Sequence, residues 1–203
     1  MRPDPQDPVL QRFAASLARR PYCKKAKKGP ILIRDRSTAL SYPYVQLNRR
    51  LVRYLVFDID RRDGAAAWLD ADLPAPTIIV RSPRRGRPHL FYELGTPVSV
   101  GGDARPGPVR FMDAVWRRLE ISLRSDLTYN QVLVKNPLHP SWDVITRDVS
   151  YELRKLADFV SHIKLPPPIP VGSAIAGGRN CALFESMRRW APVAVQTFDD
   201  DSA

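Results

Sequence analysis

The stretch Tyr54-Leu-Val-Phe-Asp-Ile-Asp60 predicts both a buried strand and a chemical site. Its apolar residues have high strand propensity, and the run ends in two aspartates spaced i, i+2. On a strand this spacing places both carboxylates on one face, about 7 Å apart along the chain. Such oxygen ligands suit Mg²⁺ or Mn²⁺, which in turn hold phosphates. The alternative is that Asp58 and Asp60 form a solvated turn or cap the next helix.

Length and composition describe a globular chain with a large positive charge. Its 203 residues are enough for one buried core with a small appendage, and 44% of them are hydrophobic. The formal net charge is +11. Such an excess favours nucleic acid or nucleotides as ligands, because each phosphate contact releases counterions. The alternative is the arginine-rich, solubilising surface of a heat-adapted or GC-rich organism.

Membrane, export and disulfide functions are not indicated. The apolar runs are too short to span a bilayer, and the first eight residues carry no apolar signal core, so we expect a cytoplasmic protein without a membrane partner. Cys23 and Cys181 lie far apart and form no Cys-x-x-Cys pair. Neither a zinc site nor a disulfide framework is therefore expected, which fits a reducing compartment.

Outside the first stretch, the pattern predicts short strands mixed with helices. Helices are expected over 8–19, 64–72, 108–123 and 150–160, and strands over 31–34, 44–47, 51–58, 77–80, 89–94 and 131–134. A long turn region is expected over 95–107. The mixture predicts an α+β (mixed α/β) fold for a core over 1–164. A proline-rich linker at 165–176 and a further helical segment within 177–203 are expected to follow.

Two basic segments are candidate phosphate-binding features. Strands 77–80 and 89–94 form a hairpin whose tip carries Arg84, Arg85 and Arg87, directly before His89. Imidazole can donate to a triphosphate while arginines neutralise it, although a purely structural histidine is the alternative. Arg105 is a further candidate for the same phosphates. The second segment, the expected loop Tyr22-Cys-Lys-Lys-Ala-Lys-Lys-Gly29, fits either a phosphate-backbone contact or a solvated run of charge.

A third acid would complete a two-metal site for nucleotidyl transfer. In that chemistry one cation lowers the pKa of the attacking 3′-hydroxyl and the other stabilises the leaving pyrophosphate. The candidates are Asp103, Asp113 and Asp126. Asp113 falls inside an expected helix and Asp103 in a glycine-rich loop. Asp126 precedes a short strand and is preferred.

In these features the sequence resembles the replication initiators of colicin-type theta plasmids, which belong to the archaeo-eukaryotic primase superfamily. The resemblance rests on Phe57-Asp-Ile-Asp-Arg61, His89-Leu-Phe-Tyr-Glu-Leu94 and Lys135-Asn-Pro-Leu-His-Pro-Ser-Trp142. Supporting matches are Pro21-Tyr-Cys23, Tyr42-Pro-Tyr-Val-Gln-Leu-Asn48 and Gly178-Arg-Asn-Cys-Ala-Leu-Phe184. All of them are colinear and together cover roughly residues 20 to 190.

The resemblance implies a primase-polymerase core with an RRM-like catalytic sheet beside an N-terminal α/β unit, and the start of a helical module over 177–203. It implies primer synthesis from nucleoside triphosphates on a DNA template at a plasmid origin, with Mg²⁺ or Mn²⁺ as cofactor. A host DNA polymerase would extend the primer.

The resemblance also assigns roles by position. Asp58, Asp60 and Asp126 match the metal-binding acids, and His89 matches the histidine that contacts the phosphates of the incoming nucleotide. A further segment with Lys135, Asn136 and His139 is expected to position template or nucleotide, unless the packing of Pro137 and Trp142 explains it.

The sequence departs from the family in two places, and two other functions stay open. Arg87 stands two residues before the histidine, where the superfamily usually has a small residue. Many relatives continue into a C-terminal DNA-binding domain, so we expect either a catalytic fragment or a short form that relies on another chain for origin choice. The first alternative function is a DNA-binding initiator fragment with an inactive site. The second, less favoured, is a metal-dependent nuclease or nicking enzyme.

Overall fold

A computed structural model describes residues 2–165, except 49, 103 and 130. The described residues belong to one compact unit, Met1–Leu165. The expected helical module at 177–203 lies outside the described residues, as does the expected linker except for Leu165. Cys181 and Asp103, one of the candidate third acids, also lie outside them.

The described chain folds into two antiparallel four-stranded sheets and five α-helices. The helices are α1 (Pro8–Ser16), α2 (Arg36–Ala39), α3 (Ala67–Asp70), α4 (Pro106–Leu123) and α5 (Leu153–Phe159). The small sheet has the order β2–β1–β3–β7, with strands Leu32–Ile33, Tyr22–Lys24, Tyr44–Gln46 and Leu133–Lys135. The central sheet has the order β4–β6–β5–β8, with strands Leu51–Asp58, Pro88–Ser99, Ile78–Arg81 and Asp143–Thr146. The predicted α+β fold class is confirmed.

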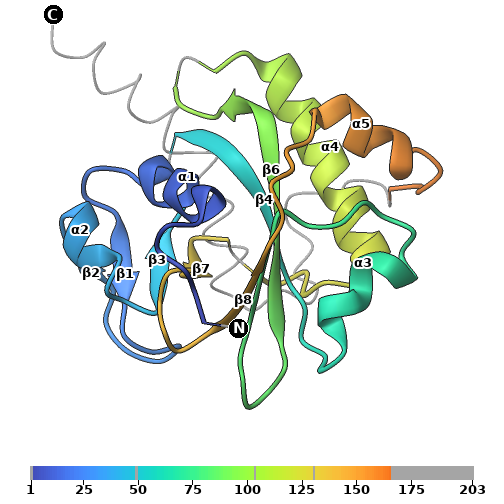
Figure 1. Cartoon of the computed structure of the whole chain (residues 1–203). Coiled ribbons are helices and arrows are strands. Elements are labelled where there is room, and N and C mark those ends of the chain that lie inside the picture. The colour runs from blue at the N-terminus through green and yellow to red at the C-terminus, as the bar shows by residue number, and fades with distance from the viewer. Residues whose placement is uncertain (1, 49, 103, 130, 166–203) are drawn as a thin grey trace, which may run out of the picture. The chain divides into compact units, whose positions relative to one another are not determined.

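Both faces of the central sheet are covered. Figure 1 shows α3, α4 and α5 on one side of it, and α1 with the small sheet on the other. Along β6, Leu90 and Tyr92 pack in the core under the helices, whereas Phe91 packs in the core with α1 and the small sheet. Burial on both faces explains why Tyr54–Phe57 is apolar without alternation.

Helix α1 has a capped N-terminus and pairs with the central sheet through Arg12, whose Nε lies 3.4 Å from Oε2 of Glu93 on β6. The carboxylate of Asp7 accepts a hydrogen bond from the backbone N–H of Val9 at 2.8 Å, and Pro8 occupies the first turn. Phe13 packs against Phe91 with ring centroids 6.1 Å apart. The predicted amphipathic helix is therefore present, although it ends at Ser16.

Tertiary pairing changes several of the expected boundaries. Strand β6 continues to Ser99, where a turn region was expected, because Val98 and Ser99 pair with Val52 and Leu51 of β4. The expected basic loop after Pro21 begins with β1, which is held between β2 and β3. Strand β8 and helix α2 were not expected either, because elements of four residues carry little periodicity.

None of the helices in the part of the chain that the structure describes combines the length and the apolar character that crossing a bilayer requires.

Candidate active site

Asp58 lies at the end of β4, directly opposite His89 at the start of β6. Residues directly opposite each other in an antiparallel pair share one face of the sheet. Their side chains meet there, with 3.4 Å between His89 Nε2 and Asp58 Oδ1. Only 7% of Asp58 is exposed. The hairpin β5–β6 and strand β4 therefore bring the predicted acid and histidine together.

Both ring nitrogens of His89 have protein partners. The backbone N–H of Lys135 donates to Nδ1 at 3.3 Å, which assigns the ring proton of neutral His89 to Nε2, facing Asp58. Burial and the nearby charge of Lys135 lower the pKa of His89 to about 4. His89 is therefore a neutral imidazole at pH 7 that donates to the Asp58 carboxylate.

Lys135 completes a buried cluster of Asp58, His89 and Lys135. Its Nζ donates to the backbone carbonyl of Arg87 at 3.1 Å and lies 3.8 Å from Asp58 Oδ1. Burial lowers the pKa of Lys135 to about 8, so it remains mostly protonated at pH 7. Burial alone would raise the pKa of Asp58, but the hydrogen bond from His89 and the charge of Lys135 lower it to about 2. The cluster thus holds an ionised carboxylate beside an ammonium group.

Lowering the pH from about 6.5 to about 4 is expected to destabilise the fold through His89. Its pKa is 6.5 for the ordinary side chain and about 4 in the folded chain, so over this window the unfolded state binds the extra proton. Above pH 6.5 this group does not lower the free energy of unfolding. Between pH 6.5 and pH 4 the free energy of unfolding falls by about 3 kcal/mol. Urea unfolding of the wild type and His89→Gln at pH 7 and pH 4.5 measures it. Equal losses in both chains would contradict the prediction.

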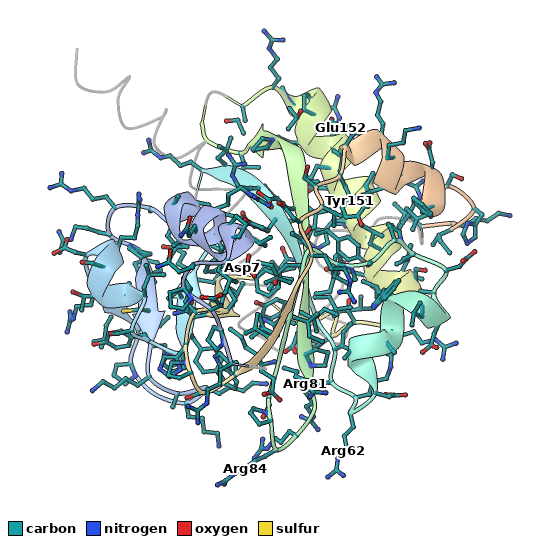
Figure 2. The ribbon with its side chains drawn as sticks, viewed as in Figure 1. Asp7, Arg62, Arg81, Arg84, Tyr151 and Glu152 are labelled. Atoms are coloured by element: carbon teal, nitrogen blue, oxygen red, sulfur yellow. The ribbon has the colours of Figure 1, made fainter. Side chains whose placement is uncertain are left out.

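Asp60 lies beyond the end of β4, at the mouth of a basic hollow. Its side chain is 48% exposed, and Oδ1 lies 3.4 Å from Nη1 of Arg87. Asp60, Arg62, Arg85 and Arg87 line a hollow of about 270 Å³. Figure 2 shows Arg62 and Arg84 pointing outward at the same end of the molecule. This concentration of guanidinium groups next to two carboxylates can attract phosphates.

Asp126 lies next to Asp58, but its carboxylate has a local partner. The backbone N–H of Asp126 donates to the carbonyl of Asp58 at 2.9 Å. Its Oδ1 accepts hydrogen bonds from the N–H and the hydroxyl of Thr128, at 2.8 and 2.7 Å. The other described candidate, Asp113, lies on the exposed side of α4. The structure thus places Asp126 nearest to the cluster without directing its carboxylate to it.

The donor set fits a divalent cation that binds together with a nucleotide. Within the described ranges, no group of three or more His, Cys, Asp or Glu side chains is arranged to hold a metal ion. Mg²⁺ is usually bound by one or two carboxylates, with substrate phosphates and water as the other ligands. Asp58, which is ionised, and Asp60, which is half exposed, can supply those carboxylates.

Arg105 is not brought into this site. It precedes α4 and lines a different hollow of about 970 Å³, together with Ser99, Phe111 and Glu152. Ser99 and Pro88 are the two ends of β6, and a strand of that length spans about 35 Å. Figure 2 shows Glu152 at the opposite end of the molecule from Arg84.

The side chain of Asn136 is buried and hydrogen-bonded to the backbone, and is not exposed to a ligand. It is completely buried, and its Nδ2 donates to the carbonyls of Leu40 and Tyr42 at 2.7 and 2.9 Å. Its Oδ1 accepts the N–H of Leu138 at 3.1 Å. The Nδ1 of His139 accepts the N–H of Ser141 at 3.1 Å, within the same turn. The side chain of Asn136 therefore connects the loop after α2 to the strand that carries Lys135.

Asn136→Ala is expected to lower the free energy of unfolding by about 2–4 kcal/mol, because two partly buried carbonyls lose their donor and the N–H of Leu138 loses its acceptor. His139→Ala, in the same turn but partly exposed, should cost less than about 1 kcal/mol. Chemical denaturation of the two variants checks the difference. Equal stability of both would show that the hydrogen bonds of Asn136 do not hold this loop.

Three side chains of the site were missed by the sequence analysis. The ring of Tyr129 packs against that of His89 with centroids 5.2 Å apart. Arg61 donates to the carbonyls of Leu123 and Arg124, at 3.1 and 3.4 Å, and so connects the end of α4 to the turn after β4. Arg62 lines the basic hollow. No periodic pattern distinguishes these residues; only their position beside Asp58, Asp60 and Asp126 could have suggested them.

The fold is similar to that of a known archaeo-eukaryotic primase (AEP) domain. The structure is similar to the AEP domain of the primase-polymerase of cyanophage S-2L, with a TM-score of 0.54 and 13% sequence identity, over 75% of this chain and 92% of that chain. A family model described as the Replicase family matches residues 16–160, and the chain belongs to that family. None of the curated proteins matches the chain. The predicted primase-like fold is confirmed, and the family match supports the predicted replication protein.

Proposed function

We propose that the chain is a primase-polymerase that joins nucleotides on a DNA template. The observation that carries this proposal is the ionised, buried carboxylate of Asp58 beside Asp60 and an arginine-lined hollow. Membership of the Replicase family and similarity to a phage protein whose name includes primase-polymerase support it.

In the proposed site, Asp58 and Asp60 hold a divalent cation, Mg²⁺ or Mn²⁺, together with the triphosphate. Such a cation, when bound, makes the attacking hydroxyl more acidic and neutralises the leaving pyrophosphate. Arg84, Arg85 and Arg87 bind the phosphates as charged donors, which orients the nucleotide for in-line attack. Asp126 remains the proposed third acid: its Oδ1 accepts from Thr128, and the remaining acceptor capacity of a carboxylate can bind a cation.

His89 and Lys135 have supporting roles in this proposal. His89 donates to Asp58, and Lys135 holds the carbonyl of Arg87 and thereby the base of the hairpin tip. Arg105, Asn136 and His139 are left out of the nucleotide site because of where they lie.

The same proposal names the partners. The template is DNA, the substrates are nucleoside triphosphates, and a host DNA polymerase extends the product in the cytoplasm. A plasmid origin as the starting point rests on the sequence resemblance alone.

Unprimed synthesis tests the proposal directly. The purified chain is incubated with single-stranded DNA and labelled nucleoside triphosphates, with Mg²⁺, with Mn²⁺ and with EDTA. We expect labelled oligonucleotides only when a divalent cation is present. DNA binding without any product would support the inactive initiator fragment, which the engagement of the Asp126 carboxylate by Thr128 favours. Shortening of a labelled template would instead indicate a nuclease.

A further inference from the structure

A row of charged and aromatic side chains crosses the small sheet and ends at the proposed catalytic cluster. Lys24 of β1 lies opposite Tyr44 of β3, and Tyr44 lies opposite Lys135 of β7. Directly opposite residues share a face with Cβ atoms about 5 Å apart. Lys135 in turn approaches Asp58 at 3.8 Å. The row therefore leads from β1 to Asp58.

The part of this face on β1 and β2 is open toward solvent. The alternate residues Cys23, Val45 and Val134 pack in the core with α1 and the central sheet. On the outer face, Tyr22 is 37% exposed and lies opposite Ile33, which is 46% exposed. We call the side chains of Tyr22, Lys24, Ile33 and Tyr44 the outer face of the small sheet.

Aromatic rings on the outer face are held in place. The ring of Tyr44 packs edge-on against that of Trp142, with centroids 5.5 Å apart. The indole N–H of Trp142 donates to the carbonyl of Pro43 at 3.0 Å, next to Tyr44 in the chain. Tyr22 is fixed through its backbone, whose N–H donates to Gln46 at 3.2 Å. The ring of Tyr22 is exposed, and an exposed tyrosine offers a stacking surface at little entropic cost because it has only two side-chain torsions.

The connection between β1 and β2 adds positive charge beside this face. It carries Lys25, Lys27 and Lys28, which are exposed and take part in none of the ion pairs between described residues. In Figure 1 this connection and the β5–β6 tip both lie at the lower end of the molecule.

We propose that the outer face of the small sheet and the β1–β2 connection bind the single-stranded template where it approaches the active site. A base stacks on Tyr22, while Lys24 and Lys27 contact backbone phosphates. Single-strand binding surfaces combine these two parts, because every base has a π face and every nucleotide a phosphate. That the strand is a template rests on the proposed function. The binding itself does not.

The test separates stacking from charge by using two probes. The full chain is titrated, without nucleotide or metal, against labelled oligo(dT) and against an abasic strand of the same length. Tyr22→Ala is expected to weaken oligo(dT) binding about 5- to 150-fold and to leave abasic binding unchanged. Tyr22→Phe should retain oligo(dT) binding. The double variant Lys24→Ala, Lys27→Ala should weaken both probes and reduce the slope of log K against log salt by about 1.4.

Matched controls come from α4, on the other side of the central sheet. Phe111 is 42% exposed, and Arg110 and Arg117 are exposed cations. Phe111→Ala and the double variant Arg110→Ala, Arg117→Ala should leave both affinities and the salt slope unchanged, and all variants should keep the wild-type thermal midpoint. Equal losses in the control set, or full oligo(dT) affinity in Tyr22→Ala, would overturn the proposal. Binding is measured without nucleotide or metal, so an inactive chain does not count against this surface.

Discussion

Asp58→Asn is expected to reduce unprimed nucleotide incorporation by about 10³-fold or more while leaving the chain folded. The carboxylate of Asp58 is ionised at pH 7, because the hydrogen bond from His89 and the charge of Lys135 lower its pKa to about 2. Asparagine has nearly the same shape and still accepts a hydrogen bond from His89, but it has no negative charge to hold a cation. The loss therefore reports the charge of Asp58 and not its packing.

Labelled-nucleotide incorporation by equal amounts of wild type and variant measures this loss. Asp63→Asn is the matched control, since its side chain is 77% exposed and lies only five positions further along the chain. It should keep activity within about twofold, as expected for an exposed side chain outside the site. Substantial synthesis by Asp58→Asn, at an unchanged unfolding midpoint, would remove Asp58 from the proposed mechanism.

His89→Ala is expected to lower kcat by about 10- to 100-fold with little change in the KM for nucleotide. The resemblance assigns this histidine to the phosphates of the incoming nucleotide. In the structure its Nε2–H instead faces Asp58 and its Nδ1 accepts the backbone N–H of Lys135. We therefore expect His89 to orient the carboxylate of Asp58 and not to bind the substrate directly.

His89→Gln provides the conservative comparison, because its amide can donate to Asp58 from about the position of the ring Nε2. We expect it to recover part of the kcat lost in His89→Ala. A raised KM for nucleotide in both variants, with kcat unchanged, would instead assign His89 to the phosphates. Steady-state kinetics with a primed template would measure both quantities, and His89→Gln should also show the shallower loss of stability at acid pH.

In the two proposals, the two basic hairpins bind different ligands: one binds the triphosphate and the other binds the template. The β5–β6 tip carries Arg85 and Arg87 next to Asp60, at the hollow proposed for the triphosphate. The β1–β2 hairpin carries Tyr22, Lys24 and Lys27, on the surface proposed for the template. Both approach the cluster of Asp58, His89 and Lys135, so one site can receive two polyanionic ligands from different sides.

Local sequence was sufficient to predict the catalytic strand and the hairpin opposite it. The apolar run up to Asp58 and the strand that starts at His89 are each encoded within ten residues, and the turn residues between β5 and β6 lie within one segment. Strand length, hairpin pairing and the α+β class depend on such short-range patterns. The sequence therefore placed Asp58 at a strand end and His89 next to a basic tip, whereas their position opposite each other follows from the pairing of β4 with β6.

Contacts between segments far apart in the sequence determined which other side chains lie at the site. Lys135 is hydrogen-bonded to His89, 46 positions away in the sequence, and Asn136 is hydrogen-bonded to Leu40, 96 positions away. The side chain of Asn136 holds the loop after α2, whereas the adjacent Lys135 approaches Asp58. The two side chains differ because Lys135 is the last residue of β7 and Asn136 belongs to the turn after it. The extension of β6 to Ser99 places Arg105 at the far end of the sheet. These positions are set by the pairing of strands. A short stretch of sequence carries no signal for that pairing, because the partner strands lie tens of residues apart.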